Sequence, residues 1–307
     1  MSTNASPRVL VAGSANLDFV VRAPRVPAPG ETVLGGGLQT FPGGKGANQA
    51  VACARAGGAP TTMLVALGAD AQGERLRRSL REAGVELVEK PVEDASGVAF
   101  ICIADSGENA IVVAPGANER LRPDDLPPLD GVSHLLLQLE TPLDSVTAWA
   151  ARARAAGVAV VLNAAPAQAL PPALLEAVDL LVVNEGELAM LAGDAGDLEA
   201  ALRRLPVPRA IVTLGGEGCV ARDGDAILRQ PAFAVEVVDT TAAGDTFCGA
   251  LVAALARGDA LAQAMREASA ASALACTVAG AQASIPDRAS VLALLDGAPA
   301  PGRGGAR

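Results

Sequence analysis

Residues 238–247, Val-Asp-Thr-Thr-Ala-Ala-Gly-Asp-Thr-Phe, combine the residue types best suited to chemistry in this chain. An apolar strand ends there, small residues follow, and a helix is predicted to begin with Asp245 in its first turn. Backbone amides of small residues can stabilise a negative oxygen, and a carboxylate beside them can accept a hydroxyl proton. The alternative is that Asp245 only stabilises the helix N-terminus. The density of small polar residues favours the functional interpretation.

A second candidate is the glycine-rich segment at residues 41–48, Phe-Pro-Gly-Gly-Lys-Gly-Ala-Asn. Paired glycines let a backbone approach a ligand closely, and the predicted helix start supplies free amides. The segment is not a Walker A loop, because that motif needs glycine and Ser/Thr where this chain has Gln39 and Gly46. A plain loop-to-helix turn with a surface lysine at position 45 is the alternative.

Three further segments place polar residues directly after predicted strands. Asn16 and Asp18 follow the first strand, where such a pair can clamp vicinal hydroxyls of a sugar. Asn184 and Glu187 follow another strand, where they could hold a hydrated Mg²⁺. An Asx turn and an ordinary helix N-cap are the respective alternatives. The glycine-rich strand exit at residues 213–218 could equally be a plain turn.

Apolar runs and helical stretches alternate along most of the chain. This alternation predicts an α/β fold, with a doubly wound, mostly parallel sheet flanked by helices. Ligands bind such sheets outside the carboxyl ends of the strands, where the polar segments lie. Strands are predicted at 8–13, 62–67, 85–88, 134–139, 158–162, 180–183 and 210–214, and helices at 46–56, 73–83, 145–156, 172–177, 244–257 and 261–279.

Two β-ribbons interrupt the alternation, residues 18–23 with 31–36 and residues 98–104 with 110–114. Together they predict a small antiparallel sheet that projects from the α/β body. A sheet of this size is marginally stable unless a ligand or another subunit covers one face. The expected division is a discontinuous body of residues 1–15, 37–96 and 116–307, with a β-lid of residues 16–36 and 97–115.

Charge and rare residue types restrict the function classes. The 307 residues include 24 Lys and Arg against 34 Asp and Glu, a net charge of −10, which disfavours nucleic-acid and membrane partners. Any phosphate must therefore be held by backbone amides or a metal. The single histidine, His134, lies in an apolar run and is expected to be structural. Five scattered cysteines without a CxxC pair, and no visible targeting signal, predict a cytoplasmic location.

The segments are more specific together than separately. Residues 42–50, 239–247 and 280–284 (Gly-Ala-Gln-Ala-Ser) resemble, in this order, motifs of the ribokinase-like carbohydrate kinase family, and the resemblance extends over residues 8–290. It implies a doubly wound domain with a β-lid, and a homodimer in which two lids clasp. It also implies ATP-dependent phosphorylation of D-ribose at O5 by direct in-line transfer.

The resemblance further implies roles for individual residues. Asp245 would be the general base, and the amides of Ala242, Ala243, Gly244 and Asp245 would form an anion hole for the phosphoryl group. Sugar contacts would come from Asn16, Asp18, Gly44, Lys45, Asn48, Glu140 and Asp245. ATP contacts would come from Asn184, Glu187, Thr213, Gly215, Gly218, Gly244 and Ser269, with Glu187 also holding Mg²⁺ through water. An activating monovalent cation, usually K⁺, would be bound by Asp239, Thr241, Ala275, Val278, Gly280 and Ser284.

Three positions depart from the family pattern. Ala242 stands where many relatives have glycine, which is acceptable if its φ stays negative. Cys248 stands where asparagine is common, and its oxidation would inhibit if it lines the site. Ser269 replaces a larger residue that often touches the nucleobase, which makes the preference for ATP less certain. The alternatives are a sister kinase for another sugar or a nucleoside and, in a different class, a non-catalytic sugar-sensing protein.

Overall fold

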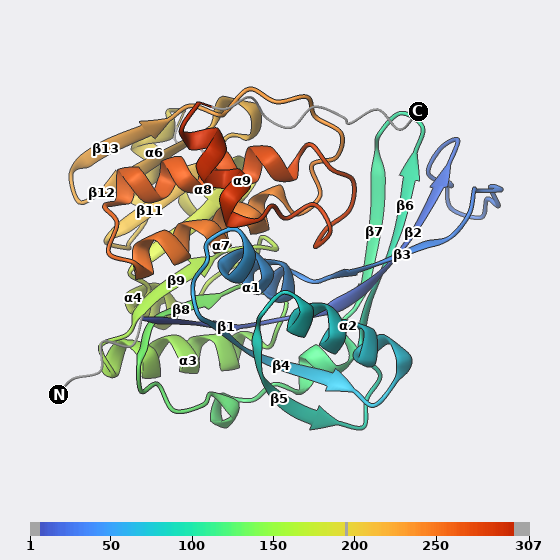
Figure 1. Cartoon of the computed structure of the whole chain (residues 1–307), viewed down its shortest axis with the longest axis horizontal. Helices are drawn as coiled ribbons and strands as arrows, with labels where there is room; N and C mark the ends of the chain where they lie inside the picture. The colour runs from blue at the N-terminus through green and yellow to red at the C-terminus, as the bar shows by residue number, and fades with distance from the viewer. Residues whose placement is uncertain (1–6, 194–195, 298–307) are drawn as a thin grey trace.

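A mostly parallel sheet forms the centre of the protein in the computed structural model, which describes residues 7–193 and 196–297 (Figure 1). Its strands are β1 (Arg8–Ala12), β4 (Thr61–Gly68), β5 (Glu86–Val92), β8 (Val132–Leu137), β9 (Ala159–Asn163), β10 (Leu180–Asn184), β11 (Arg209–Thr213), β12 (Cys219–Asp223) and β13 (Ala226–Gln230). They lie in the order β13-β12-β11-β10-β9-β8-β1-β4-β5. Strands from β5 to β11 are parallel, and β12 runs against both of its neighbours. The predicted α/β class is confirmed, and the β12–β13 hairpin was not predicted.

Helices cover both faces of this sheet because its strand residues alternate in direction. Val9 and Val11 of β1 face one apolar core, whereas Leu10 and Ala12 face the other. The first core is closed by α1 (Lys45–Arg55), α2 (Ala71–Glu82), α7 (Ala243–Ala256), α8 (Leu261–Ala275) and α9 (Arg288–Leu295). The second is closed by α3 (Leu143–Ala155), α4 (Pro172–Ala177), α5 (Glu185–Ala192) and α6 (Leu198–Arg204). Within the described residues, no helix is both long enough and apolar enough to span a membrane.

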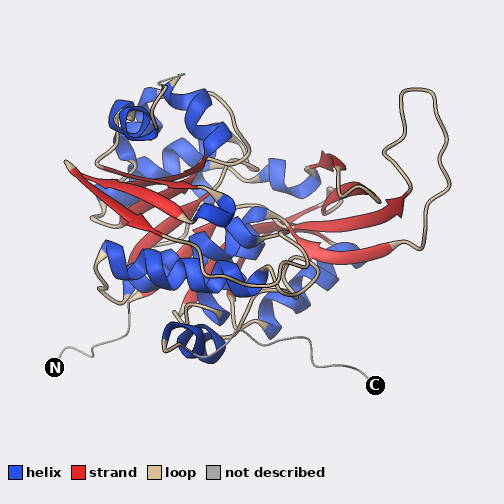
Figure 2. Cartoon of the chain, turned by 90° about the horizontal axis from the view of Figure 1, so that it is seen from above, coloured by secondary structure: helices blue, strands red, loops and turns tan. Residues whose placement is uncertain are grey.

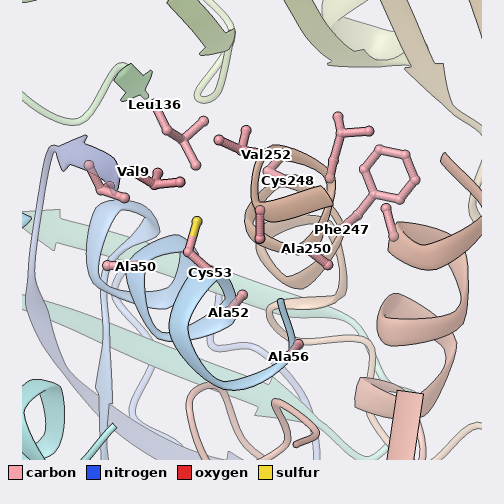
Figure 3. Close-up of a cluster of buried hydrophobic side chains, with 14 of the residues drawn as sticks. Val9, Ala50, Ala52, Cys53, Ala56, Leu136, Phe247, Cys248, Ala250 and Val252 are labelled. Carbon is pink, nitrogen blue, oxygen red and sulfur yellow. The ribbon is translucent and has the colours of Figure 1, made fainter. Parts of the chain in front are cut away.

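The helices α1 and α7 approach each other closely, and this contact brings their N-termini together. Small side chains of α1, including Ala52, lie beside α7 in the core shown in Figure 3. A Cβ atom added at Gly249 would lie 2.5 Å from the carbonyl oxygen of Gln49 and 2.5 Å from Cβ of Ala52. Glycine at position 249 therefore permits the approach that brings the start of α1 to the start of α7.

A second sheet stands at one side of the body (Figure 1, Figure 2). It contains β2 (Asn16–Ala23), β3 (Gln39–Gly43), β6 (Gly97–Ala104) and β7 (Asn109–Ala114), in the order β3-β2-β6-β7. The expected strand at 31–36 is wrong, because β3 pairs with β2 instead and is an edge strand, where Pro42 is tolerated. The sheet is mixed rather than purely antiparallel, since β2 and β6 are parallel.

The division into body and lid at the residues given above stays our interpretation. Residues 1–6 and 298–307 of the expected body lie outside the described residues. The predicted helix at 261–279 ends earlier, at Ala275, and the chain then turns toward Gly280. That turn belongs to the expected cation site described below.

Candidate active site

The polar segments meet at the carboxyl edge of the central sheet. Strand β1 lies between β4 and β8, so the strand order reverses there and leaves a crevice for a ligand. Ser14 and Glu140 follow the ends of β1 and β8, and Asn163 ends β9. The N-terminus of α1 reaches the same edge, where the Gly46 amide donates to Oγ of Ser14 at 3.3 Å.

Asp245 is held at the start of α7 by two amide side chains from α1. Its Oδ2 atom accepts a hydrogen bond from Nδ2 of Asn48, and its Oδ1 atom accepts one from Nε2 of Gln49, each at 2.9 Å. The Asp245 side chain is buried except for a small exposed fraction. The structure thus brings two predicted residues, Asn48 and Asp245, together. Gln49 was missed, although it directly follows Asn48 in the glycine-rich motif.

Glu140, which follows β8, connects the residues after β1 to the first residue of α1. Its Oε2 atom accepts hydrogen bonds from Oγ of Ser14 at 2.6 Å and from the amide of Lys45 at 3.0 Å. Burial disfavours the charged form of the Lys45 ammonium, but the neighbouring carboxylates of Asp245, Glu140 and Glu187 outweigh burial and raise its pKa. Lys45 is therefore a fixed positive charge among the predicted site residues.

Asp18 presents a further carboxyl to this cluster from the lid sheet. Burial, followed by the charges of Glu140 and Asp245, raises the pKa of Asp18 to about 7. The carboxyl lies against the backbone of Gly43, where an added Cβ would be 2.2 Å from Oδ2 of Asp18. Asp18 therefore titrates near neutral pH in the absence of a ligand.

Asn16 and Gly44 lie at the junction of lid and body. The Oδ1 atom of Asn16 accepts a hydrogen bond from Nδ2 of Asn118 at 2.8 Å, so this oxygen is already used within the protein. Gly44 caps α1 with a φ of 87°, and a Cβ there would lie 2.6 Å from the amide nitrogen of Asn16. Glycine at position 44 is needed for this close approach and for this left-handed backbone conformation.

Ala242 precedes α7 with φ 59° and ψ 10°, which is left-handed. The condition under which alanine would be acceptable at this position, a negative φ, is therefore not met. Among residues 7–193 and 196–297, Ala242 is the sole non-glycine residue with a positive φ. The turn is fixed on its far side by Ser272, whose Oγ donates to the carbonyl oxygen of Ala243 at 2.9 Å. Tertiary contacts thus impose a conformation for which glycine would be better suited.

A cavity of about 200 Å³ lies in front of the α7 N-terminus. Predicted catalytic and nucleotide-binding residues meet in its lining, which includes Lys45, Asn184, Glu187, Thr213, Ala242, Gly244 and Asp245. Asn184 and Glu187 also form a capping box on α5, in which each side chain accepts a hydrogen bond from the other residue's amide at 2.8 Å. Burial is the main cause that raises the pKa of Glu187. The N-cap interpretation of this pair is correct, and it leaves open a second role for the Oε1 atom.

A larger, mostly apolar cavity of about 360 Å³ adjoins the first and shares Thr213 and Gly244 with it. Its lining includes the predicted nucleotide residues Thr213, Gly215, Gly218, Gly244 and Ser269, together with Phe233, Val235 and Phe247. Gly218 has a φ of 101°, and a Cβ there would lie 2.1 Å from the carbonyl oxygen of Gln230. The two cavities together have a polar end at Asp245 and an apolar end suited to a flat ring.

Asp239 connects the loop before α7 to the turn after α8. Its Oδ1 atom accepts hydrogen bonds from the amide and Oγ1 of Thr241, and its Oδ2 atom accepts one from the amide of Gly280. Burial disfavours the charged carboxylate, but these hydrogen bonds outweigh it and lower its pKa. Two further residues of the expected cation site flank Gly280 in sequence. Ser284 is buried, whereas Val278 is half exposed. No cluster of three or more His, Cys, Asp or Glu side chains that could hold a metal occurs in the described part of the chain.

Thiol and imidazole chemistry is not supported at this site. Cys248 lines the smaller cavity but is 2% exposed, and burial raises the pKa of its thiol well above the ordinary value. A thiol that stays protonated reacts slowly with oxidants, which argues against redox control through Cys248. His134 lies near the opposite, amino end of β8, where burial lowers its pKa to about 4. The structural interpretation of His134 agrees with this position.

Known proteins match this chain over nearly its whole length. The pfkB family of carbohydrate kinases matches residues 6–288. A ribokinase of Haemophilus influenzae is 39% identical over 300 residues, which cover 93% of this chain and 97% of that protein. A deoxyribokinase of Salmonella typhi is 33% identical over 292 residues, covering 91% and 95%. The structure of Arabidopsis thaliana ribokinase complexed with ribose and ATP matches with a TM-score of 0.87 and 35% identity, covering 95% and 99%.

Proposed function

Because the chain belongs to the pfkB family of carbohydrate kinases, we propose that its sugar substrate is D-ribose, which it phosphorylates at O5 with ATP to give D-ribose 5-phosphate. The position of Asp245 carries the proposal. This carboxylate lines the cavity at the α7 N-terminus and accepts a hydrogen bond from Asn48 of the glycine-rich segment. One group therefore faces both the expected sugar and the expected phosphates.

On the sugar side, polar groups of the lid and of α1 would orient ribose. Asp18 and Glu140 accept hydrogen bonds from hydroxyl groups, and Asn48 and Lys45 donate to hydroxyl oxygens. Asn16 would contribute through its Nδ2 atom, because its Oδ1 atom is bonded to Asn118. Held in this way, the O5 hydroxyl faces Asp245 and needs little reorientation before it reacts.

Asp245 then takes the O5 proton as that oxygen attacks the γ-phosphorus in line with the departing ADP. General-base assistance of this kind contributes about 10²–10⁴-fold. Negative charge on the transferring group is received by the amides at residues 242–245 and by the Lys45 ammonium. Oriented donors of this type usually supply a larger part of the rate than proton transfer does.

The residues present fit the two cations that we propose for the reaction. Mg²⁺ bound with ATP would neutralise phosphate charge, and the oxygen-rich pair Asn184 and Glu187 suits a hydrated ion. The activating monovalent cation, usually K⁺, would lie beside Asp239 and Thr241, with backbone oxygens of Ala275, Val278, Gly280 and Ser284 as further ligands. Because Asp239 connects the two loops involved, a cation there would fix the shape of the anion hole.

We also propose a homodimer formed through one face of the lid sheet. In the β2–β6–β7 register, Phe19, Phe100 and Val112 lie side by side on that face, and the two phenyl rings stack with centroids 5.5 Å apart. Phe100 is 54% exposed and Val112 is 68% exposed. Asp18 points to the opposite face, so an apolar partner would cover the outer face without blocking the sugar.

A second candidate is a deoxyribokinase, because a relative of that name is 33% identical to the chain. The two sugars differ only in the 2-hydroxyl group. A site that hydrogen-bonds this group discriminates strongly against the analogue that lacks it. A sugar-sensing protein without catalysis is disfavoured because Asp245, Asp239 and the glycine-rich nucleotide loop are all retained.

The test measures ADP production in MgATP and KCl with each of five acceptors in turn: D-ribose, 2-deoxyribose, fructose, adenosine and cytidine. We expect clear preference for ribose, and loss of rate when K⁺ is replaced by tetramethylammonium. Preference for another sugar would overturn the ribose assignment while keeping a kinase with Asp245 as base. Sugar binding with no ADP production on any of them would favour the sensor.

A further inference from the structure

Gln49 lies at the centre of a buried chain of amide side chains that ends on Asp245. Its Nε2 atom donates to Oδ1 of Asp245 and to Oδ1 of Asn163, both at 2.9 Å, and its Oε1 atom accepts from Nε2 of Gln138 at 2.6 Å. Asn163 in turn donates to the carbonyl oxygen of Val182 at 3.2 Å. Gln49 is 0% exposed, so it does not reach a substrate.

The chemistry of Asp245 fixes the direction of this chain. An ionised carboxylate can only accept hydrogen bonds, so Gln49 must turn its Nε2 atom toward Asp245. Its Oε1 atom then faces Gln138, which must present Nε2 in return. The Oε1 atom of Gln138 is consequently left buried without a partner, and so is Oδ1 of Asn48, whose Nδ2 atom also serves Asp245.

Both unpartnered oxygens therefore belong to residues connected to Asp245, Asn48 directly and Gln138 through Gln49. A buried polar atom without a partner costs about 1–3 kcal/mol. The backbone is also shaped for this arrangement, because a Cβ at Gly13 would lie 2.0 Å from Oε1 of Gln138. Buried atoms without a partner also occur at Thr141, Thr246 and Gln282, so the connection of these two oxygens to hydrogen bonds that end on Asp245 is what points to a function.

We propose that Gln49 is a positioning residue that fixes the rotation of the Asp245 carboxylate, so that one oxygen stays aimed at the hydroxyl to be phosphorylated. The proposal rests on the assignment of Asp245 as general base. Charges around Asp245 show why a second tether matters, since Lys45 attracts the carboxylate while Asp18 and Glu187 repel it. With Asn48 alone, the carboxylate could turn about a single hydrogen bond toward Lys45.

The experiment compares Q49M with the wild-type protein, using the sugar that the wild type phosphorylates fastest. Methionine keeps the length of glutamine but neither donates nor accepts as an amide does. We expect kcat to fall about 10–100-fold, as for a small misplacement of a catalytic group, with KM for sugar and ATP within about threefold. Thr246→Val is the matched control, because Thr246 follows Asp245 in sequence and is equally buried, but no hydrogen bond connects its Oγ1 atom to Asp245 or to Gln49, so its kcat should stay unchanged.

Gln138→Met tests the same chain from its far end and is available if Q49M does not fold. It should lower kcat in the same direction, and the double variant should be no slower than Q49M within about twofold, because Gln138 acts only through Gln49. A folded Q49M or Gln138→Met protein with wild-type kcat would overturn the proposal, as would fully additive losses. Failure of the ribose assignment shows separately, in the sugar preference of the wild type.

Discussion

The amide of Gly280 donates to Oδ2 of Asp239 at 2.9 Å and so connects two loops that are 41 residues apart in sequence. One loop leads directly into α7 and Asp245, and the other follows α8. Oδ1 of the same carboxylate accepts hydrogen bonds from the amide and the hydroxyl group of Thr241. A single side chain thus connects the expected cation loop to the expected anion hole.

Asp239→Ala should therefore abolish stimulation by K⁺. The variant loses a possible oxygen ligand and the contact that orders both loops. We expect equal, low turnover in KCl and in tetramethylammonium chloride, whereas the wild type is faster in KCl. Asp225→Ala, in an exposed turn, serves as control and should respond to K⁺ normally. Undiminished stimulation in Asp239→Ala would place the cation elsewhere.

Asp245→Asn should lower kcat by about 10²–10⁴-fold while ribose and ATP still bind with affinities within a few fold of wild type. Asparagine keeps the size of the side chain but cannot take a proton from the hydroxyl group. It also offers one accepting oxygen to two donors, Asn48 and Gln49. Turnover should be measured under saturating substrates and binding by calorimetry. Turnover within threefold of wild type would exclude Asp245 as the base.

Much of the fold and part of the site could be predicted because local sequence determines them. Alternating apolar runs revealed the parallel strands, and the glycine-rich motifs identified Asn48 and Asp245 as candidates. The β12–β13 hairpin was missed even though Gly224-Asp225, the two-residue loop between its strands, is a typical hairpin signal. β3 contains Pro42, and proline disfavours a strand except at a sheet edge, a position that the sequence does not reveal.

The remaining features depend on contacts between distant segments. In the sequence Gln49 is an ordinary polar residue of a predicted helix. Its hydrogen bond to Asp245 depends on the close packing of α1 on α7. The positive φ of Ala242 likewise follows from the loops on both sides of it, which Asp239 and Ser272 fix. The sequence contains only indirect signals for these relationships, namely the place of Gln49 next to Asn48 and the glycine that many relatives have at the position of Ala242.

Ribose binding should weaken as pH falls through 7, because the pKa of Asp18 is about 7 in the free protein. Below that pH the carboxyl is neutral and loses charge-assisted hydrogen bonds to the sugar. If only the ionised form binds, the dissociation constant should rise about tenfold from pH 8 to pH 6. Calorimetry without ATP measures this change, and Asp18→Asn should bind more weakly at pH 8 with little dependence on pH. A constant affinity in the wild type would contradict the assignment.

Phe100→Lys should convert the proposed dimer to a monomer. The substitution places a charge in the apolar outer face formed with Phe19 and Val112, where a partner lid would have to bury it. Sedimentation equilibrium of the two proteins gives the masses directly. Met190→Lys is the matched control, because Met190 is 55% exposed on α5 and outside the lid. A wild-type monomer, or an unchanged mass in Phe100→Lys, would rule out this interface.

Ala242→Gly should stabilise the protein, although most alanine-to-glycine changes destabilise. Alanine at φ 59° has a steric cost of about 1–2 kcal/mol in the left-handed region, which glycine avoids. Glycine also increases the conformational entropy of the unfolded chain, which lowers the free energy of unfolding by about 0.4–1 kcal/mol. The net gain of roughly 0.5–1 kcal/mol should raise the Tm by about 2 °C. Ala243→Gly, one residue later with a negative φ, should lower the Tm instead. If both variants lower the Tm equally, then residue 242 does not hold the left-handed conformation in solution.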